Sequence, residues 1–200
     1  MSHYPEIYVI RHGQTEWNLA GRHQGRLDSP LTPHGRGQAV AMGRLLAEKL
    51  PHPQEFSYFT SPQGRSRATA ALALGEVSQP LPEACEDARL CEVAFGRWEG
   101  KTLPEIRQEW PELAQLAEED PVSWHFLSPG GETLQELECR AEAFLKDLRG
   151  PSVIFTHGIL SRVLRARWLG MNVGEMLGLP GGQGVIFHLS QELGHVRLEK

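Results

Sequence analysis

The sequence has little cysteine, no long apolar run and no excess of basic residues, and each absence excludes a class of protein. Its three cysteines, Cys85, Cys91 and Cys139, are an odd number and make no disulfide framework. Reduced thiols and an N-terminus without a signal-peptide pattern predict a cytoplasmic protein. No apolar segment approaches the length of a membrane span, so we expect no membrane partner.

The charge balance argues against general nucleic-acid binding. Lysine and arginine number 20 against 25 aspartates and glutamates, which gives a formal net charge of −5. Nucleic acids require a basic face, so we expect no nucleic-acid partner. The sequence also lacks the paired cysteine and histidine spacing of a zinc site. It is silent on oligomeric state, and a homodimer stays open.

Strand-like and helix-like segments alternate along the chain. Strands are predicted at 6–10, 56–60 and 152–156, and a closing antiparallel pair at 185–189 and 195–198. Helices are predicted at 33–50, from the N-cap Ser61 to 74, at 132–149 and at 158–169, with 11–31 as a long loop. This order predicts an α/β fold, a three-layer sandwich whose central, mostly parallel sheet is flanked by helices.

Residues 76–131 interrupt this alternation and contain short helical patterns near 103–109 and 110–118. The 200 residues are enough for one domain with its own hydrophobic core. We therefore interpret the chain as a single domain over 1–200, with 76–131 inserted as a cap.

Three segments leave predicted strands at the carboxyl edge of the sheet, where ligands bind in such folds. They are residues 11–13, 61–65 and 157–158. Two of them also open helices, whose N-terminal N–H groups attract anions. We therefore predict that His12, Arg11, Arg65 and His157 converge on a phosphate pocket.

The residue types in this pocket suit phosphoryl transfer. Two arginines can grip a phosphoryl group through paired donors, and a neutral His12 can attack phosphorus to form a phosphohistidine. Neighbouring cations should keep His12 neutral near pH 7. A carbonyl oxygen beside Gly13 that accepts from Nδ1 of His12 would leave Nε2 free to attack.

Six motifs in order along the chain carry a resemblance to a known family. They are RHGQTEWN at 11–18, QGRLDSPLT at 24–32, SPQGRSRATA at 61–70, LCEVAFGRWEG at 90–100, PGGET at 129–133 and THG at 156–158. Together they resemble the histidine phosphatase superfamily, in the branch of cofactor-dependent phosphoglycerate mutases, broad-specificity acid phosphatases and α-ribazole phosphatases. The match covers nearly the whole chain.

The resemblance implies roles at the matching positions. His12 would carry the phosphoryl group, and Glu92 would protonate the leaving alkoxide and then activate water. Enclosure and the nearby phosphate charge would favour the protonated acid that the first step needs. The phosphoryl group and the attacking water would be contacted by Arg11, Arg65, His157, Asn18, Gln24 and Gly158. No metal or other cofactor is required.

The end of the cap is expected to meet the substrate. Trp124 and His125 precede the PGGET turn, which borders the substrate mouth in relatives, and we expect one of Trp124, His125 and Phe126 to touch the leaving group. His23 stands where an apolar residue is commoner in the family, and we expect it to face solvent.

Hydrolysis is the reaction that this sequence favours. A mutase must keep water from the phosphohistidine and hold a phosphoglycerate carboxylate, which family mutases do with a longer insertion and an adjacent arginine pair. Between 101 and 131 this chain has only Lys101 and Arg107 as cations. We predict a phosphomonoesterase for a small phosphorylated metabolite. A phosphoglycerate mutase and a non-catalytic phospho-ligand-binding module stay open as alternatives.

Overall fold

The computed structural model describes residues 4–50, 52–120 and 123–199 and confirms the predicted α/β architecture. Within these residues one six-stranded sheet has the order β3-β2-β4-β1-β5-β6. The strands are Ile7–Arg11 (β1), Ser57–Thr60 (β2), Cys85–Glu86 (β3), Ser152–Thr156 (β4), Ile186–Ser190 (β5) and Gly194–Leu198 (β6). β3, β2, β4 and β1 run parallel, whereas β5 and β6 pair antiparallel.

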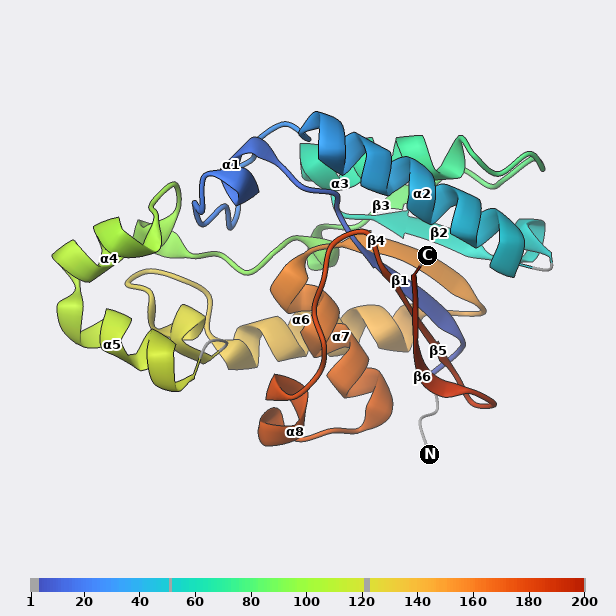
Figure 1. Cartoon of the computed structure of the whole chain (residues 1–200). Coiled ribbons are helices and arrows are strands. Elements are labelled where there is room, and N and C mark those ends of the chain that lie inside the picture. The colour runs from blue at the N-terminus through green and yellow to red at the C-terminus, as the bar shows by residue number, and fades with distance from the viewer. Residues whose placement is uncertain (1–3, 51, 121–122, 200) are drawn as a thin grey trace.

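Helices cover both faces of the sheet, as Figure 1 shows. On one face lie α2 (Pro33–Lys49) and α3 (Gly64–Leu74), and on the other α6 (Leu134–Asp147) and α7 (Gly158–Leu169). The shorter helices are α1 (Glu16–Leu19), α4 (Leu103–Glu109), α5 (Pro111–Glu119) and α8 (Val173–Leu177). No helix in the described ranges is long and apolar enough to cross a membrane.

Strand β1 shows how the sequence builds two cores from one sheet. Successive side chains of a strand point to opposite faces. Ile7 and Val9 accordingly join the cluster under α6 and α7, whereas Tyr8 and Ile10 join the cluster under α2 and α3. All five residues of β4 are buried, as expected for a central parallel strand. The central strands are therefore packed on both faces, and this packing fixes the position of the residues that follow their carboxyl ends.

Helix α3 begins later than predicted. Its N-cap is Gln63, not Ser61. The Ser61 hydroxyl accepts from the N–H of Gln63 over 3.3 Å and lies 2.8 Å from Nε2 of His157. The short elements α1, α8 and β3 were not predicted. β3 has two residues and pairs with β2 only at Phe59 and Thr60, so it is too short to give a recognisable strand pattern in the sequence.

The segment interpreted as a cap carries α4 and α5, which lie beyond one end of the sheet in Figure 1. Both helices match the predicted ranges closely. Trp98, Ile106 and Trp124 are buried in the same apolar cluster as residues of α6 and α7. The cap is therefore packed onto the core. Its description as an insertion into a single domain stays an interpretation.

Two glycines let the loop after β1 cross the first turn of α2. A Cβ atom at Gly35 would overlap the carbonyl oxygen of Gln14, and one at Gly13 would overlap the carbonyl oxygen of Gly35. Only backbone without side chains fits at this crossing. The position of His12, directly before Gly13, depends on it.

We predict that Gly35→Ala destabilises the protein by about 1–3 kcal/mol, the usual range for overpacking, and lowers activity by shifting Gly13. The matched control is Gly37→Ala in the same helix, where a Cβ meets nothing within 4 Å. That change should stabilise by up to about 1 kcal/mol, because alanine is the better helix former. Urea unfolding measures both. Equal changes in the free energy of unfolding for the two substitutions would contradict the close contact between Gly35 and the loop after β1.

Candidate active site

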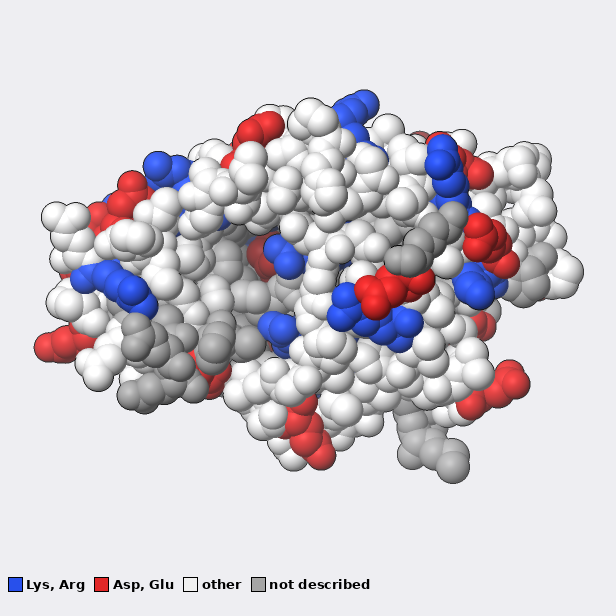
Figure 2. Space-filling view, in the orientation of Figure 1, with Lys and Arg blue, Asp and Glu red and all other residues white. Residues whose placement is uncertain are grey.

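A cavity of about 310 Å³ opens where β1 and β4 end. Figure 2 shows this face hollowed between the α4–α5 end and the rest of the molecule, with basic and acidic side chains in the hollow. Most of the predicted site residues line the cavity: Arg11, His12, Asn18, Gln24, Arg65, Glu92, His125 and Gly158. His157 and Trp124 are not part of its wall.

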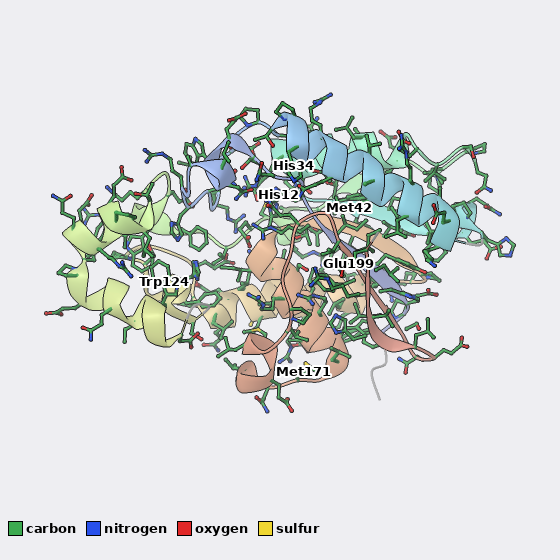
Figure 3. The ribbon with its side chains drawn as sticks, in the orientation of Figure 1. His12, His34, Met42, Trp124, Met171 and Glu199 are labelled. Atoms are coloured by element: carbon green, nitrogen blue, oxygen red, sulfur yellow. The ribbon has the colours of Figure 1, made fainter. Side chains whose placement is uncertain are left out.

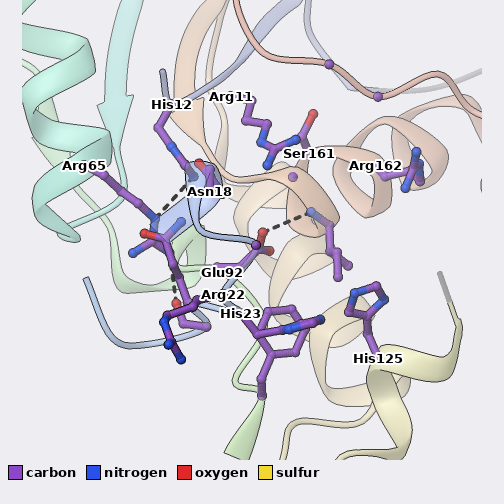
Figure 4. Close-up of a pocket in the computed structure, with 18 of the residues that line it drawn as sticks. Arg11, His12, Asn18, Arg22, His23, Arg65, Glu92, His125, Ser161 and Arg162 are labelled. Atoms are coloured by element: carbon purple, nitrogen blue, oxygen red, sulfur yellow. Dashed lines mark hydrogen bonds between the residues drawn. The ribbon is translucent and has the colours of Figure 1, made fainter. Parts of the chain in front are cut away.

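His12 is almost fully buried at the edge of the sheet, and its two ring nitrogens have distinct partners. Nδ1 lies 2.8 Å from the carbonyl oxygen of Gly13. Because a carbonyl only accepts, Nδ1 carries the proton and Nε2 keeps a lone pair. The Nε N–H of Arg65 donates to that lone pair over 3.3 Å (Figure 4). The expected contact with Gly13 is present, and Nε2 is the atom available to attack.

The surroundings of His12 keep its imidazole neutral. Burial lowers the pKa of His12 well below its ordinary value, and the Arg11 and Arg65 guanidinium groups lower it further. The hydrogen bond to Gly13 raises this pKa without reversing the effect. A neutral imidazole is the form that acts as a nucleophile.

Arg65 is held beside His12 by the loop before α2. Its Nη1 donates to the Leu27 carbonyl over 2.7 Å and to the Asp28 carboxylate over 2.9 Å, and its Nη2 donates to the Gly25 carbonyl over 2.9 Å. Asp28 also accepts from the backbone N–H of Arg65 in the first turn of α3. The N-terminus of α3 is therefore taken by a carboxylate of the protein itself.

Two buried polar atoms near His12 have no hydrogen-bond partner among the described residues: Nε of Arg11 and Nδ1 of His157. The His12 and His157 rings are 5.2 Å apart between centroids. Burial, and next the charge of Arg65, lowers the pKa of His157 well below its ordinary value. Buried polar groups are rarely left unpaired. The unpaired Nε donor of the Arg11 guanidinium, near that of Arg65, therefore suits an anionic ligand.

Glu92 is the only acidic side chain in the described wall of the cavity. Its Oε2 accepts from the N–H of Ile159, and its Oε1 accepts from those of Val93 and Leu160, all over 3.1 Å. The expectation that the first turn of α7 offers its N–H groups to the ligand is therefore wrong for Ile159 and Leu160. The carboxylate of Glu92 already accepts from these donors.

Gln63 and Arg140 position Glu92, and the sequence did not reveal either of them. Gln63 accepts from the N–H of Glu92 and donates to the carbonyl of Gly25, both over 2.8 Å. Arg140 donates to the carbonyls of Cys91 and Glu92 over 2.7 and 3.2 Å. Both act on backbone groups, and motif spacing carries no signal for such contacts.

Asn18 and Gln24 both bring amide groups to the cavity wall. Oδ1 of Asn18 accepts from Nε2 of Gln183 over 2.9 Å, and Oε1 of Gln24 accepts from the Ser29 hydroxyl over 3.4 Å. Neither amide nitrogen donates to another described residue. Both nitrogens remain donors for a ligand.

The cap side of the cavity is aromatic. His23, Phe95 and His125 line it, with ring centroids 5.3 Å apart for His23 and Phe95 and 5.5 Å apart for His23 and His125. The expectation that His23 faces solvent is wrong, because its ring packs among these neighbours. Burial lowers the pKa of His23.

Trp124 has a different place from that expected. It is 5% exposed and packs against Trp98 with ring centroids 4.7 Å apart. Figure 3 places it within the cap, away from His12. Of the two cap residues predicted to bind substrate, only His125 reaches the cavity wall.

Two arginines of α7 line the cavity but were not predicted from the sequence. Arg162 and Arg165 line it, four and seven residues after Gly158. This spacing places all three on one face of a helix. The helix starts at the end of β4, so the spacing was the signal that could have revealed them.

Comparison with known proteins identifies the family. The model of the histidine phosphatase superfamily (branch 1) matches residues 7–200. The chain belongs to this superfamily. Phosphoserine phosphatase 1 of Hydrogenobacter thermophilus is 28% identical over 193 residues, covering 93% of this chain and 87% of that protein. A Klebsiella pneumoniae protein with a phosphoglycerate mutase name, GpmB, is 34% identical over 189 residues, covering 88% and 76%.

The same family appears among solved structures. A mycobacterial glucosyl-3-phosphoglycerate phosphatase in complex with VO3 superposes with a TM-score of 0.76 at 27% identity, covering 98% of each chain. The chain is thus a histidine phosphatase-type enzyme that acts on phosphorylated small molecules. Its relatives include proteins named as phosphatases and proteins named as phosphoglycerate mutases.

The buried neutral histidines predict a loss of stability on mild acidification. His12 and His157 have pKa values well below 6.5 when folded, whereas unfolded histidines take up a proton as the pH falls through about 6.5. Their stability contribution is therefore full above that pH and is lost below it. Each adds a slope of up to about 1.4 kcal/mol per pH unit.

Urea unfolding of this histidine phosphatase between pH 7 and pH 5 measures this slope. The comparison variant is His195→Gln, which removes a third histidine with a lowered pKa. Burial and the charge of Arg165 lower the pKa of His195 to about 4. This variant should show a shallower slope than the parent. A free energy of unfolding that is constant across this range would contradict the neutral state of these histidines.

Proposed function

We propose that this histidine phosphatase is a metal-independent phosphomonoesterase that works through a phosphohistidine at His12. The observation that carries the proposal is the geometry of His12. Its proton is held on Nδ1 by Gly13, and its Nε2 lone pair faces Arg65 in a cavity that also contains Arg11 and Glu92. The described residues include no cluster of three or more His, Cys, Asp or Glu suited to a metal ion.

In the first step, Nε2 of His12 attacks phosphorus while the P–O bond to the leaving group breaks. Glu92 gives its proton to the leaving alkoxide. Arg65 turns its Nε donor from the lone pair of His12 to a phosphoryl oxygen, and Arg11 offers the donor that has no protein partner. Developing charge on the phosphoryl oxygens is thereby met by fixed cations.

In the second step, Glu92 takes a proton from water, and the oxygen of that water attacks phosphorus as the P–N bond breaks. Inorganic phosphate leaves, and both His12 and Glu92 return to their starting states. The proton that Glu92 takes from water in the second step is the one that it gives to the leaving alkoxide of the next substrate.

Hydrolysis is favoured over transfer to a second substrate position by the cap. Neither Lys101 nor Arg107 lines the cavity, and Lys101 pairs with Glu109. The cavity is at the small end of the usual range for ligand pockets, which supports a small metabolite as substrate. Relatives named phosphoserine phosphatase and glucosyl-3-phosphoglycerate phosphatase support the hydrolase assignment.

His12→Ala should abolish turnover and preserve vanadate binding in part, because the arginines remain. The assay measures phosphate release from a phosphomonoester panel with and without EDTA, together with isomerisation of 3-phosphoglycerate. We expect release by the parent in both conditions and none by the variant. Unchanged release by the variant would contradict the mechanism, and isomerisation without release would show a mutase.

Glu92→Gln should slow hydrolysis of alkyl phosphates by about 10²–10⁴-fold, the usual range for general acid–base catalysis. The loss should be smaller for phosphoryl transfer from p-nitrophenyl phosphate, because p-nitrophenolate leaves without a proton. Glu16→Gln, at an exposed position, is the control and should match the parent. A loss below about tenfold on alkyl esters would assign the acid role to another group.

A further inference from the structure

The positive charge of the cavity is not balanced on the side formed by α7. Five arginines line the cavity: Arg11, Arg22, Arg65, Arg162 and Arg165. Arg22 pairs with Glu105, and Arg65 pairs with Asp28. Of the α7 arginines, Arg162 and Arg165 line the cavity, and neither forms an ion pair with any residue in the described ranges. Arg11 serves the phosphoryl group in the mechanism above. The charge of Glu92 acts on Arg162 and raises its pKa against the effect of burial, but no carboxylate of the described residues lies within ion-pair distance of Arg162 or Arg165.

Arg162 is held at one end and open at the other. Its Nε donates to the Leu179 carbonyl over 3.0 Å, and neither Nη group donates to a described residue. Nη2 lies close to the backbone of Gly181: a Cβ atom added at Gly181 would be only 3.1 Å from Nη2 of Arg162. An anchored guanidinium with two free Nη groups presents a planar fork, which matches the oxygens of a carboxylate or phosphate.

Arg165 is a second cation of α7 in the wall of the cavity, and its charge acts together with that of Arg162. It is fully buried, donates through Nη2 to the Pro180 carbonyl over 2.8 Å, and lies over the Phe187 ring at 3.7 Å. Burial, together with the charge of Arg162, lowers the pKa of Arg165 to about 9. Arg165 is therefore still cationic at pH 7, and two neighbouring cations attract an anion more strongly than one.

We propose that Arg162, supported by the charge of Arg165, binds a second anionic group of the substrate. In Figure 4 Arg162 lies across the cavity from Arg65, with Glu92 between them. A substrate whose phosphoryl group sits at His12 would thus direct its other end toward Arg162. The substrate class is phosphomonoesters that carry a carboxylate or a second phosphate. This inference rests on the proposed function for the placement of the phosphoryl group.

Matched pairs of esters test this subsite. O-phosphoserine differs from O-phosphoethanolamine by one carboxylate, and 3-phosphoglycerate differs in the same sense from glycerol 3-phosphate. The parent should prefer the carboxylate-bearing member of each pair in kcat/KM. Arg162→Gln should lower kcat/KM for that member by about 10- to 100-fold, mainly through KM, and change its partner by less than about threefold.

The control variant is Arg167→Gln on the same helix, whose side chain pairs with Glu142 and does not line the cavity. It should keep the preference of the parent. Equal losses on both members of a pair in Arg162→Gln, or no preference in the parent, would overturn the proposal. Isomerisation of 3-phosphoglycerate that Arg162→Gln removes would still support the anion subsite.

Binding separates a failure of the subsite from a failure of the proposed function. Calorimetry uses the His12→Ala chain, with and without Arg162→Gln, and measures the affinities for O-phosphoserine and O-phosphoethanolamine. Tighter binding of O-phosphoserine that is lost with Arg162 supports the subsite even where the parent shows no turnover. Equal affinities for the two esters contradict the subsite even where the parent is an active phosphatase.

Discussion

The crowding of cationic groups at one edge of the sheet is the constraint on which the site depends. The Arg11 and Arg65 guanidinium groups stand beside the imidazoles of His12 and His157. Burial first, and then the charge of these arginines, lowers the pKa of both rings and keeps them neutral. Neutrality makes Nε2 of His12 a nucleophile, and the unpartnered Nε of Arg11 makes the same place receptive to an anion. One electrostatic arrangement thereby prepares the nucleophile and attracts its target.

Protein carboxylates control where that positive charge acts. Asp28 occupies the first turn of α3 and fixes Arg65, while Glu92 occupies the first turn of α7. N–H groups at both helix N-termini are thus used to orient side chains of the protein itself. Gln63 joins Glu92 to the loop around Gly25 that holds Arg65, so the acid–base group and the phosphate-binding arginine share one frame.

The sequence predicted the parallel sheet and the meeting of His12 with Arg65, because parallel strands end at the same edge of the sheet, although β4 lies between β1 and β2. It also predicted that a backbone carbonyl accepts from Nδ1 of His12, and the structure shows that this carbonyl belongs to Gly13. The side-chain environment in the cap could not be predicted. Trp124 is drawn into the apolar cluster with Trp98, and His23 fills the wall in its place, because packing among distant segments decides both. Gln63 and Arg140 act on backbone groups of distant segments, and the sequence does not show such contacts, although Gln63 lies within the motif at 61–70.

The most direct test of the account is to identify the residue that carries the phosphoryl group during turnover. The protein is mixed with a phosphomonoester, quenched in alkali within the first turnover, digested and examined by mass spectrometry. The account predicts an acid-labile, alkali-stable phosphoryl group on His12. A phosphoryl group on any other residue, or steady release of phosphate with none on the protein, would contradict it.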